Sequence, residues 1–390
     1  MPAVAKRRPR VSESAPRLRP PTAQLARAPE HFMALALAEA RKGLGTTSPN
    51  PCVGAAIVKN GELVALGHTA PVGGPHAEIV ALRAAGAKAK GADLYSTLEP
   101  CNHFGRTPPC TEAILNAGIA RVFVGARDPN PHVPGAGASR LRKAGVEVVD
   151  GVLEKACTAL HAAFFKHITT GRPFVTLKIA ATLDGRIAAS SGDSKWVTGP
   201  AARQRVHAMR AEADAVLVGA GTARADNPRL TARDVNAVRQ PLRVVLDGHE
   251  PLPRSLALFR DRSARTLLAT TQPRSAPKGV ETLHCKQGRD GRAELDDLLR
   301  QLGELGVTQL LVEGGQKLAT ALIAAGQVDA LALFLAPKLL GNGLAWLQTG
   351  PTQKMADALQ LEDVQVELLG EDLLLTGSPR PLGAARRRGA

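Results

Sequence analysis

The sequence predicts two successive α/β domains that meet near Gly171-Arg172-Pro173. Two apolar runs flank Asn60-Gly61, which is a strong signal for a two-residue β-hairpin turn. Beyond that hairpin, helical spacing alternates with short apolar runs, and a new series of apolar runs begins after Pro173. The chain has 390 residues with 44% hydrophobic and 3% aromatic side chains, so we expect packed cores built mainly from aliphatic residues.

The first half is predicted to be a hairpin followed by alternating helices and strands, which gives a three-layer α/β/α domain. Helical spacing of Met33, Leu35 and Leu37 predicts a helix from Glu30 to Gly43. The hairpin spans 53–68. Further patterns predict helices at 76–91, 110–119, 137–145 and 153–169, and strands at 92–100, 120–126 and 146–151.

The second half is predicted to be another α/β domain, over residues 174–378. Its order of elements differs from that of the first half, so the two halves are not a repeat. Apolar runs predict strands at 174–180, 215–219, 242–247, 265–270, 309–315 and 330–340, helices near 200–212, 292–305 and 316–326, and a closing hairpin at 364–377.

The net charge of +15 suggests nucleic acid as a partner, but its position argues against that interpretation. Residues 1–29 carry a net +6 and residues 379–390 a net +4, which leaves +5 for the body. Both tails are rich in Pro and Ala without apolar periodicity, so we expect them to be disordered. Anion or nucleic-acid tethering by these tails is the minority alternative.

The targeting signals favour a soluble, cytoplasmic protein. The chain contains no uninterrupted run of about 18 apolar residues, so no membrane span is predicted. The N-terminal tail lacks the apolar core of a secretory signal; its basic character leaves an organelle transit peptide open, although the amphipathic pattern is weak. Five cysteines form an odd set without a disulfide-like array, which fits a reducing compartment.

Four residues form a candidate metal centre: His76, Glu78, Cys101 and Cys110. His76 and Cys110 begin predicted helices, and Cys101 follows the end of a predicted strand. A helix N-terminus stabilises thiolate, and zinc binds thiolate and neutral imidazole, with three protein ligands leaving a position for water. Zinc lowers the pKa of such a water toward neutrality, and Glu78 has the chemistry of a general acid and base for its proton.

The spacing of the two cysteines departs from the usual pattern. H-x-E…P-C-x-x-C is typical of zinc enzymes that deaminate nucleobases, but here eight residues separate Cys101 from Cys110. A bare C-x8-C is equally compatible with two buried thiols. The H-x-E motif upstream and the prolines before both cysteines favour zinc.

The second half contains no complete G-x-G-x-x-G motif between a strand and a helix, because Arg224 stands where the third glycine would follow Gly219 and Gly221. Glu313-Gly314-Gly315 ends a predicted strand just before a helix. Its glycines would let a phosphate approach the free N–H groups of that helix, although an ordinary tight turn fits as well.

Several motifs closely resemble the bifunctional deaminase–reductase family of riboflavin biosynthesis, which has the long loop between its cysteines. The resemblance covers about residues 30–378. It implies a cytidine-deaminase-like domain at 30–171 and a dihydrofolate-reductase-like domain at 174–378 that binds NADPH. The motifs are TSPNPCVGAAIVKNGE, PHAE, TLEPCNHFGRTPPC and DPNP in the first half, and KIAATLDGRIAASSGDSKWVTG, VGAGTARADNPRLTAR, VEGG and APKLLG in the second.

The resemblance implies two reactions on a small molecule: hydrolytic deamination of 2,5-diamino-6-(5-phosphoribosylamino)pyrimidin-4-one, then reduction of its ribosyl group to ribityl with NADPH. Family members are often dimers or tetramers, so we expect a homo-oligomer. The implied roles are zinc binding for His76, Cys101 and Cys110, proton transfer for Glu78, NADPH contact for Ala180, Trp196, Thr222, Asp226 and Gly315, and substrate contact for Asn50, Ser194, Arg210, Leu230, Arg233 and Glu313.

Other residues carry weaker expectations. Arg210 and Arg233 suit a 5′-phosphate, whereas surface ion pairing is the usual role of Arg; for Asn50 the alternative is an Asn-Pro turn. No sequence pattern singles out a general acid for the reductase. The remaining expectations place His103 and Arg106 in a loop near the first substrate, Lys178 and Asp184 in the second cleft, His68 in a structural role, and Cys52, Cys157 and Cys285 as inert thiols.

Two other functional interpretations stay open at this stage. A nucleic-acid-editing deaminase with basic arms would use the same zinc chemistry, but it leaves the second domain without a role. A zinc-stabilised binding scaffold is non-enzymatic, but structural zinc usually has four protein ligands and only three are predicted here.

Overall fold

The structure is a computed structural model that describes residues 28–104, 108–130, 136–247, 250–273, 275–350 and 354–380. The predicted disordered tails, apart from their innermost residues, lie outside the described residues, as does Arg106. Within the described ranges, no helix has the length and apolar character needed to cross a membrane.

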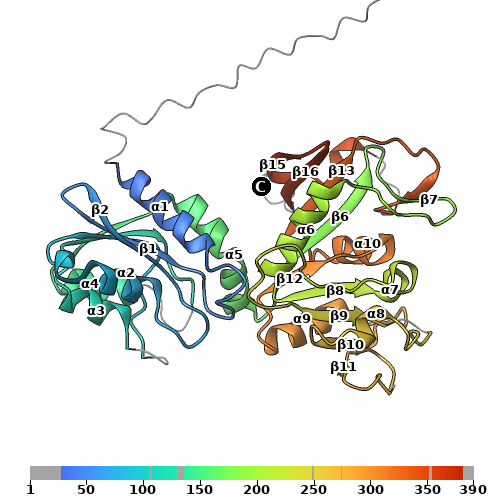
Figure 1. Cartoon of the computed structure of the whole chain (residues 1–390), viewed down its shortest axis with the longest axis horizontal. Coiled ribbons are helices and arrows are strands. Elements are labelled where there is room, and N and C mark those ends of the chain that lie inside the picture. The colour runs from blue at the N-terminus through green and yellow to red at the C-terminus, as the bar shows by residue number, and fades with distance from the viewer. Residues whose placement is uncertain are drawn as a thin grey trace, which may run out of the picture.

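The first half is a three-layer α/β/α unit, as predicted, with α1 and α5 on one side of a sheet and α2 to α4 on the other (Figure 1). The sheet order is β2-β1-β3-β4-β5; β1 pairs antiparallel with β2 and β3, and the β3–β4 and β4–β5 pairs are parallel. The elements are α1 (Pro29–Arg41), β1 (Gly54–Lys59), β2 (Glu62–His68), α2 (Ala77–Ala85), η2 (Gly86–Ala89), β3 (Asp93–Leu98), α3 (Cys110–Asn116), β4 (Arg121–Ala126), α4 (Ala136–Lys143), β5 (Glu147–Asp150) and α5 (Glu154–Thr170).

Two local features follow from glycine positions. Asn60 and Gly61 both have positive φ, 56° and 77°, as the predicted two-residue hairpin turn requires. The helix predicted over 76–91 is shorter than expected, because Gly86 adopts φ 55° and ends α2, leaving a 3₁₀ turn.

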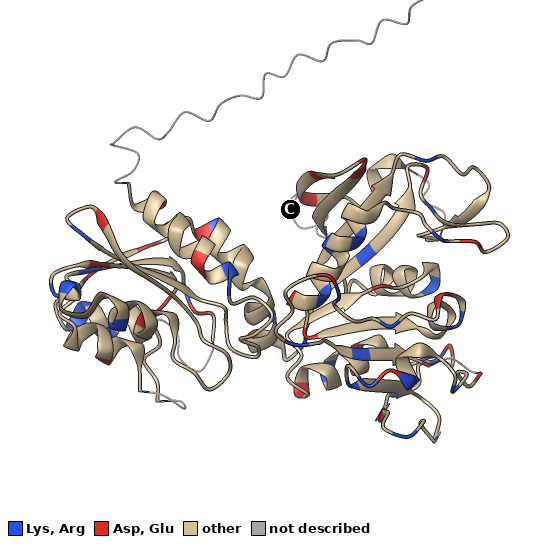
Figure 2. Ribbon diagram, viewed as in Figure 1, with Lys and Arg blue, Asp and Glu red and all other residues tan. Residues whose placement is uncertain are grey.

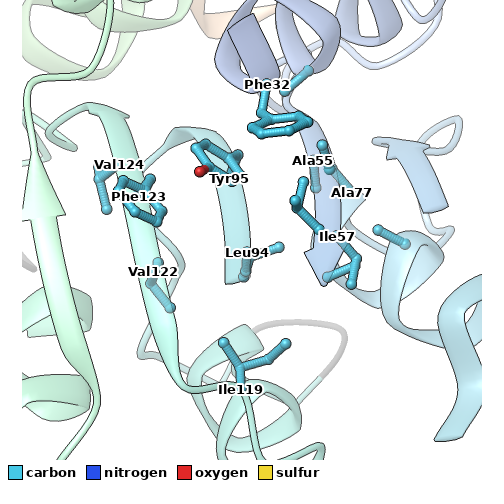
Figure 3. Packing of buried hydrophobic residues seen from close by; sticks show 14 of the residues in the cluster. Phe32, Ala55, Ile57, Ala77, Leu94, Tyr95, Ile119, Val122, Phe123 and Val124 are labelled. Atoms are coloured by element: carbon cyan, nitrogen blue, oxygen red, sulfur yellow. The ribbon is translucent and has the colours of Figure 1, made fainter. Parts of the chain in front are cut away.

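The core of the first half covers both faces of the sheet, and its aromatic part lies between α1 and the sheet. Phe32 packs against Tyr95, which stacks on Phe123 with 4.4 Å between ring centroids (Figure 3). Helix α1 approaches β1 closely, since a Cβ on Gly54 would lie 1.9 Å from the carbonyl oxygen of Ala36. This packing fixes the start of β1, where the loop carrying Asn50 ends.

The second half is built on a nine-stranded sheet of order β11-β10-β9-β8-β12-β6-β13-β16-β15. Its strands run parallel from β11 to β13, and β16 and β15 are antiparallel additions. The elements are β6 (Phe174–Thr182), β7 (Arg186–Ala189), α6 (Pro200–Glu212), β8 (Ala215–Gly219), α7 (Ala220–Asp226), β9 (Leu242–Leu246), α8 (Ala257–Arg260), β10 (Thr266–Thr270), β11 (Glu281–His284), α9 (Leu295–Glu304), β12 (Gln309–Val312), α10 (Gln316–Ala324), β13 (Ala330–Ala336), β14 (Gly343–Ala345), η3 (Met355–Asp357), β15 (Leu361–Leu369) and β16 (Asp372–Pro379).

The sequence patterns found the parallel strands from β10 to β13 in the sheet order and the longer helices of this half, and missed several short elements. The strand predicted to reach 340 ends at Ala336, because Pro337 follows it. The closing hairpin is longer than predicted and turns at Gly370, φ 70°. The elements without a predicted counterpart are β7, α7, α8, β11, β14 and η3, all of seven residues or fewer.

Two candidate active sites

The three predicted zinc ligands meet at one point of the first half. Ligand atoms of His76, Cys101 and Cys110 all lie within 4.8 Å of one another. Nδ1 of His76 is 3.3 Å from Sγ of Cys110 and 3.5 Å from Sγ of Cys101. Two ligands of a tetrahedral zinc at 2.3 Å lie roughly 3.5–4 Å apart, so this donor set fits zinc with little movement.

The local fold explains the convergence. His76 is the N-cap residue of α2, and Cys110 is the first residue of α3. Cys101 follows the carboxyl end of β3, and the backbone N–H of Cys110 donates to its sulfur over 3.3 Å. The positive ends of two helices therefore face the two thiols, which favours thiolate.

The two sulfurs differ in proton affinity. Hydrogen bonding from Cys110 outweighs burial and lowers the pKa of Cys101 to about 4. The same interaction, together with burial and the charge of Glu78, raises the pKa of the Cys110 thiol. The Cys101 sulfur is thus the better metal ligand of the two, and Cys110 would have to release its proton to bind a metal.

Glu78 lies directly beside this cluster. It is 3% exposed in the first turn of α2, and its Oε2 is 3.5 Å from Sγ of Cys110. Burial, followed by the negative charge on Cys101, raises the pKa of Glu78 to about 7. A carboxyl group of this pKa can both accept and donate a proton near neutral pH, as the sequence pattern suggested.

His103 and Asn50, two weaker candidates for substrate contact, both lie in loops of the first half. His103 lines a small cavity together with Cys101, Glu99 and Asp128. Asn50 is exposed in the α1–β1 loop, and its backbone N–H donates to the carbonyl of Thr47 over 2.9 Å. This hydrogen bond closes a turn over residues 47–50, just before Pro51, and Asn50 lies at the surface.

The remaining thiols and His68 have structural surroundings. Burial raises the pKa of Cys52 and of Cys285 to about 11 and that of Cys157 to about 12, so all three are protonated and poorly reactive at neutral pH. His68 pairs with Glu39 at 2.8 Å.

The second candidate site is centred on a buried carboxylate. Glu313 follows β12 and accepts two hydrogen bonds from Arg210 of α6, and Nζ of Lys178 on β6 lies 3.8 Å away. Burial alone would raise the pKa of Glu313, but the Arg210 charge and its hydrogen bonds outweigh it and lower that pKa to about 2. Burial lowers the pKa of Lys178, against the opposing effect of Glu313.

Four of the predicted contacts form two neighbouring pairs. A Cβ on Gly315, the N-cap of α10, would lie 3.1 Å from Oγ1 of Thr222, so these two predicted NADPH contacts are neighbours. The Ser194 hydroxyl donates to Asp226 over 3.2 Å, which joins a predicted substrate contact to a predicted cofactor contact. Gly315 follows β12, and Thr222 lies in α7, which follows β8, so the first pair lies at the carboxyl ends of two parallel strands, where ligands bind in open α/β sheets.

The other predicted contacts are more dispersed. Trp196 is 66% exposed, with the guanidinium of Arg203 4.6 Å from its ring centroid. Leu230 is buried at φ 56°, an uncommon conformation for a branched residue. Arg233 is exposed and donates to Oγ1 of Thr231. Ala180 lies on β6 and packs with a small apolar cluster around Phe334.

Comparisons with known proteins cover both halves. Residues 26–126 match the cytidine and deoxycytidylate deaminase zinc-binding region, and residues 173–375 match the RibD C-terminal domain. The riboflavin biosynthesis protein RibD of Aquifex aeolicus is 44% identical over 89% of this chain and 97% of its own length. RibD of Escherichia coli is 42% identical over 89% of this chain and 98% of its own.

The chain belongs to the RibD family. A solved structure from Thermotoga maritima, a diaminohydroxyphosphoribosylaminopyrimidine deaminase/5-amino-6-(5-phosphoribosylamino)uracil reductase, is 40% identical with a TM-score of 0.81, covering 90% of this chain and 99% of that chain. This RibD-family chain is therefore a bifunctional enzyme of riboflavin biosynthesis, with a zinc-binding deaminase domain and an NADPH-dependent reductase domain that act on a small pyrimidine.

Lys178 and Asp184, which were both expected in the second cleft, have different surroundings in the structure. Lys178 lies beside Glu313 in the reductase cleft, where no proton donor had been identified. Asp184 instead accepts hydrogen bonds from Thr182 and from the backbone N–H groups of Leu340 and Gly341, so it holds the chain after β13 in place.

Proposed function

We propose that His76, Cys101 and Cys110 hold the zinc of the deaminase and that Glu78 moves its protons. The convergence of the three donor atoms beside a buried carboxyl group supports this assignment. The substrate is 2,5-diamino-6-(5-phosphoribosylamino)pyrimidin-4-one, and Asn50 contacts it from the rim. When bound, zinc activates a water molecule for attack.

Glu78 acts twice in this proposal. It accepts a proton from the water as a C–O bond forms at the ring carbon that bears the 2-amino group. It then delivers that proton to the amine as the C–N bond breaks, and ammonia leaves. A pKa of about 7 suits both transfers, because the group changes charge easily near neutral pH.

The deciding experiment replaces Glu78 with Ala and follows ammonia release and NADPH oxidation separately. We expect deamination to fall by roughly 10²–10⁴-fold, while the deaminated intermediate is still reduced at the wild-type rate. The control is Glu112→Ala, which removes an exposed first-turn carboxylate of α3. Ammonia release at the wild-type rate in Glu78→Ala would refute the proposed role.

For the reductase we propose that Lys178 and Glu313 line the reacting end of the cleft. Reduction adds a hydride at C1′ of the ribosyl group and a proton to the oxygen that leaves C1′. NADPH supplies the hydride, held by Ala180, Trp196, Thr222, Asp226 and Gly315. Lys178 supplies the proton, because burial lowers its pKa and so favours proton release; the Glu313 carboxylate, 3.8 Å away, holds the ammonium group in place.

Substrate contacts are proposed for Ser194, Arg210, Leu230, Arg233 and Glu313. Arg210 is engaged by Glu313 and the carbonyl of Thr231, so it orients the cleft. Arg233 suits the 5′-phosphate better, because it reaches solvent, while partial desolvation and the nearby charges of Arg210 and Arg229 lower its pKa. An anion would relieve that repulsion.

Lys178→Met should reduce NADPH oxidation at least about 100-fold with NADPH binding retained.

We further infer that the chain forms a homo-oligomer. Strand β15 is an edge of the nine-stranded sheet, and Val364, Val366 and Leu368 expose 50%, 62% and 73% of their surface at alternate positions. A second copy paired along this edge would cover the stripe. Light scattering should show a dimer or larger species that Val366→Lys shifts toward monomer; an unchanged mass would contradict this interface.

We also propose that the protein is cytoplasmic and does not bind nucleic acid. All five cysteines are free, which suits a reducing compartment. Basic and acidic segments are interspersed over both halves of the ribbon in Figure 2, which argues against a continuous basic face. We expect no salt-dependent shift of tRNA or single-stranded DNA by the intact chain, and a clear shift would instead favour the basic tails as tethers.

A further inference from the structure

The loop between α1 and β1 belongs to the deaminase half but is held by the reductase half. Gly45 of this loop packs against the end of α6, where a Cβ on Gly45 would lie 2.3 Å from the carbonyl oxygen of Ala211. Gly45 also has φ 77°, so both space and backbone conformation require glycine. Helix α6 and strand β12 lie on the side of the second half that faces the first (Figure 1).

Arg239 joins this loop to a buried carboxylate. Its Nε donates to the carbonyl oxygen of Gly45, and its Nη2 donates to Oδ1 of Asp214. Asp214 stands between α6 and β8 and is 8% exposed. The guanidinium is therefore fixed from the reductase side while it holds the backbone of the deaminase loop.

Asp214 reaches the same loop by a second route. Its Oδ2 accepts from the backbone N–H of Thr308 at 2.8 Å, from the Thr308 hydroxyl at 2.7 Å and from the N–H of Gln309 at 2.9 Å. Because the Thr308 hydroxyl gives its one proton to Asp214, its contact with Ser48 at 3.1 Å is one that Ser48 donates. One carboxylate thus anchors both Gly45 and Ser48.

Asn50 follows directly after these anchors. Pro49 and Pro51 flank it, so its backbone has little freedom to move independently of Ser48. The Asn50 N–H is also tied to the carbonyl of Thr47, which is buried. A shift at Gly45 or Ser48 is therefore passed on to Asn50.

We propose that the reductase domain sets the position of Asn50 in the deaminase site, with Asp214 acting through Arg239 and Thr308. Arg239 and Ser48 are then positioning residues for deamination, although Arg239 belongs to the reductase fold. The inference rests on the proposed contact between Asn50 and the deaminase substrate. It predicts a coupling that alters substrate binding and leaves proton transfer at Glu78 intact.

A second contact between the halves offers a matched control. Lys155 of α5 pairs with Asp363 of β15 at 2.5 Å, also across the two domains, but both side chains are largely exposed and neither touches the 42–53 loop. Lys155→Met removes a cation from the interface as Arg239→Met does. It should leave both activities unchanged, because exposed ion pairs contribute little.

The test measures deamination kinetics by ammonia release and reduction with the deaminated intermediate. Arg239→Met should raise the deaminase KM roughly five- to thirtyfold, as expected for one or two lost hydrogen bonds, with kcat within about twofold. Ser48→Ala should raise it by a smaller factor, and Arg239→Lys should recover part of the loss because it restores a single donor. The reductase KM and kcat should stay at wild-type values.

Combining Arg239→Met with Asn50→Ala distinguishes this inference from the proposed function. If Arg239 acts through Asn50, the double variant should be no worse than Asn50→Ala alone. A raised KM in Asn50→Ala, with Arg239→Met and Ser48→Ala both unchanged, overturns the coupling and leaves the proposed function standing. An unaffected Asn50→Ala removes the proposed role of Asn50 and the coupling with it. A parallel loss of both activities in Arg239→Met would show general destabilisation and also overturn the inference.

Discussion

Arg210 holds Glu313 by two parallel hydrogen bonds, 2.6 Å from Nε to Oε1 and 2.9 Å from Nη2 to Oε2. Such a bidentate pair fixes the plane of the carboxylate as well as its charge. With Lys178 3.8 Å away, the reductase cleft contains an oriented anion between two cations. The side chains at this end of the cleft are therefore held in place by one another, without a contribution from a ligand.

Removing the Arg210 guanidinium should destabilise the fold, because the Glu313 carboxylate then stays buried without its main partner. Arg210→Met leaves Glu313 without its main partner, and we expect a loss of about 3–5 kcal/mol in the free energy of unfolding, measured in urea. Arg205→Met is the control on the same helix, since Arg205 pairs loosely with Glu212 at 3.7 Å and should cost less than about 1 kcal/mol. Equal stability of the two variants would contradict the proposed importance of the pair.

The same pair predicts a pH dependence. Against burial, which raises it, the interaction with Arg210 lowers the pKa of Glu313 to about 2, whereas an unfolded Glu titrates near about 4.3. The pair therefore stabilises the fold fully above the unfolded pKa, on the order of 3 kcal/mol, and loses this effect as pH falls from about 5 to 2. The stability difference between wild type and Glu313→Gln should shrink over that range, and a constant difference would refute the assignment.

Loss of one zinc ligand should separate the two activities. We expect Cys101→Ser to contain much less than one zinc per chain by metal analysis and to release ammonia far more slowly, because a hydroxyl is a poor substitute for thiolate. Reduction of the deaminated intermediate should continue at the wild-type rate. Cys285→Ala, which removes a buried thiol of the other half, should retain its zinc. Full zinc content in Cys101→Ser would show that the metal is held elsewhere.

The contact between Gly315 and Thr222 should govern cofactor binding. Gly315→Ala places a methyl group 3.1 Å from Oγ1 of Thr222, so one of the two proposed NADPH contacts must move. We expect the KM for NADPH to rise roughly fivefold or more, with deamination unaffected. Gly350→Ala is the control, because a Cβ there meets nothing within 4 Å. An unchanged KM in Gly315→Ala would place the cofactor away from this turn.

The features predicted well from the sequence depend on neighbouring residues. The Asn60-Gly61 turn is fixed by the backbone preferences of two residues, and His76 and Glu78 are placed by the start of one helix. Cys101 and Cys110 are brought together by a short strand–loop–helix connection. In each case the geometry follows from a local motif, so spacing along the chain was informative.

The arrangement around Glu313 has no such local origin. Strand β12 pairs with β6 in a register that sets Val312 opposite Leu177, so the next residues, Glu313 and Lys178, lie side by side. This register depends on the sheet order β8-β12-β6, which no motif encodes. Arg210 joins them from a helix 103 residues away in sequence. The proposed role of Lys178 as proton donor therefore became apparent only once the strands were paired.

Short elements escaped prediction for a different reason. β7 and β14 have four and three residues and pair only with each other, so they are too short to show a period. α7 contains Gly221 within seven residues, which weakens its helical pattern. Tertiary contacts, more than intrinsic preference, determine such segments.

The close approach of Gly45 to Ala211 limits how these two domains can be recombined. A chimera that joins this deaminase half to the reductase half of another protein would need Asp214, Arg239 and Thr308 transplanted with it, together with a helix end that admits the glycine. Grafting at the 171–173 linker alone would preserve the covalent connection and lose the docking surface. The transferable module is thus larger than the sequence boundary between the domains indicates.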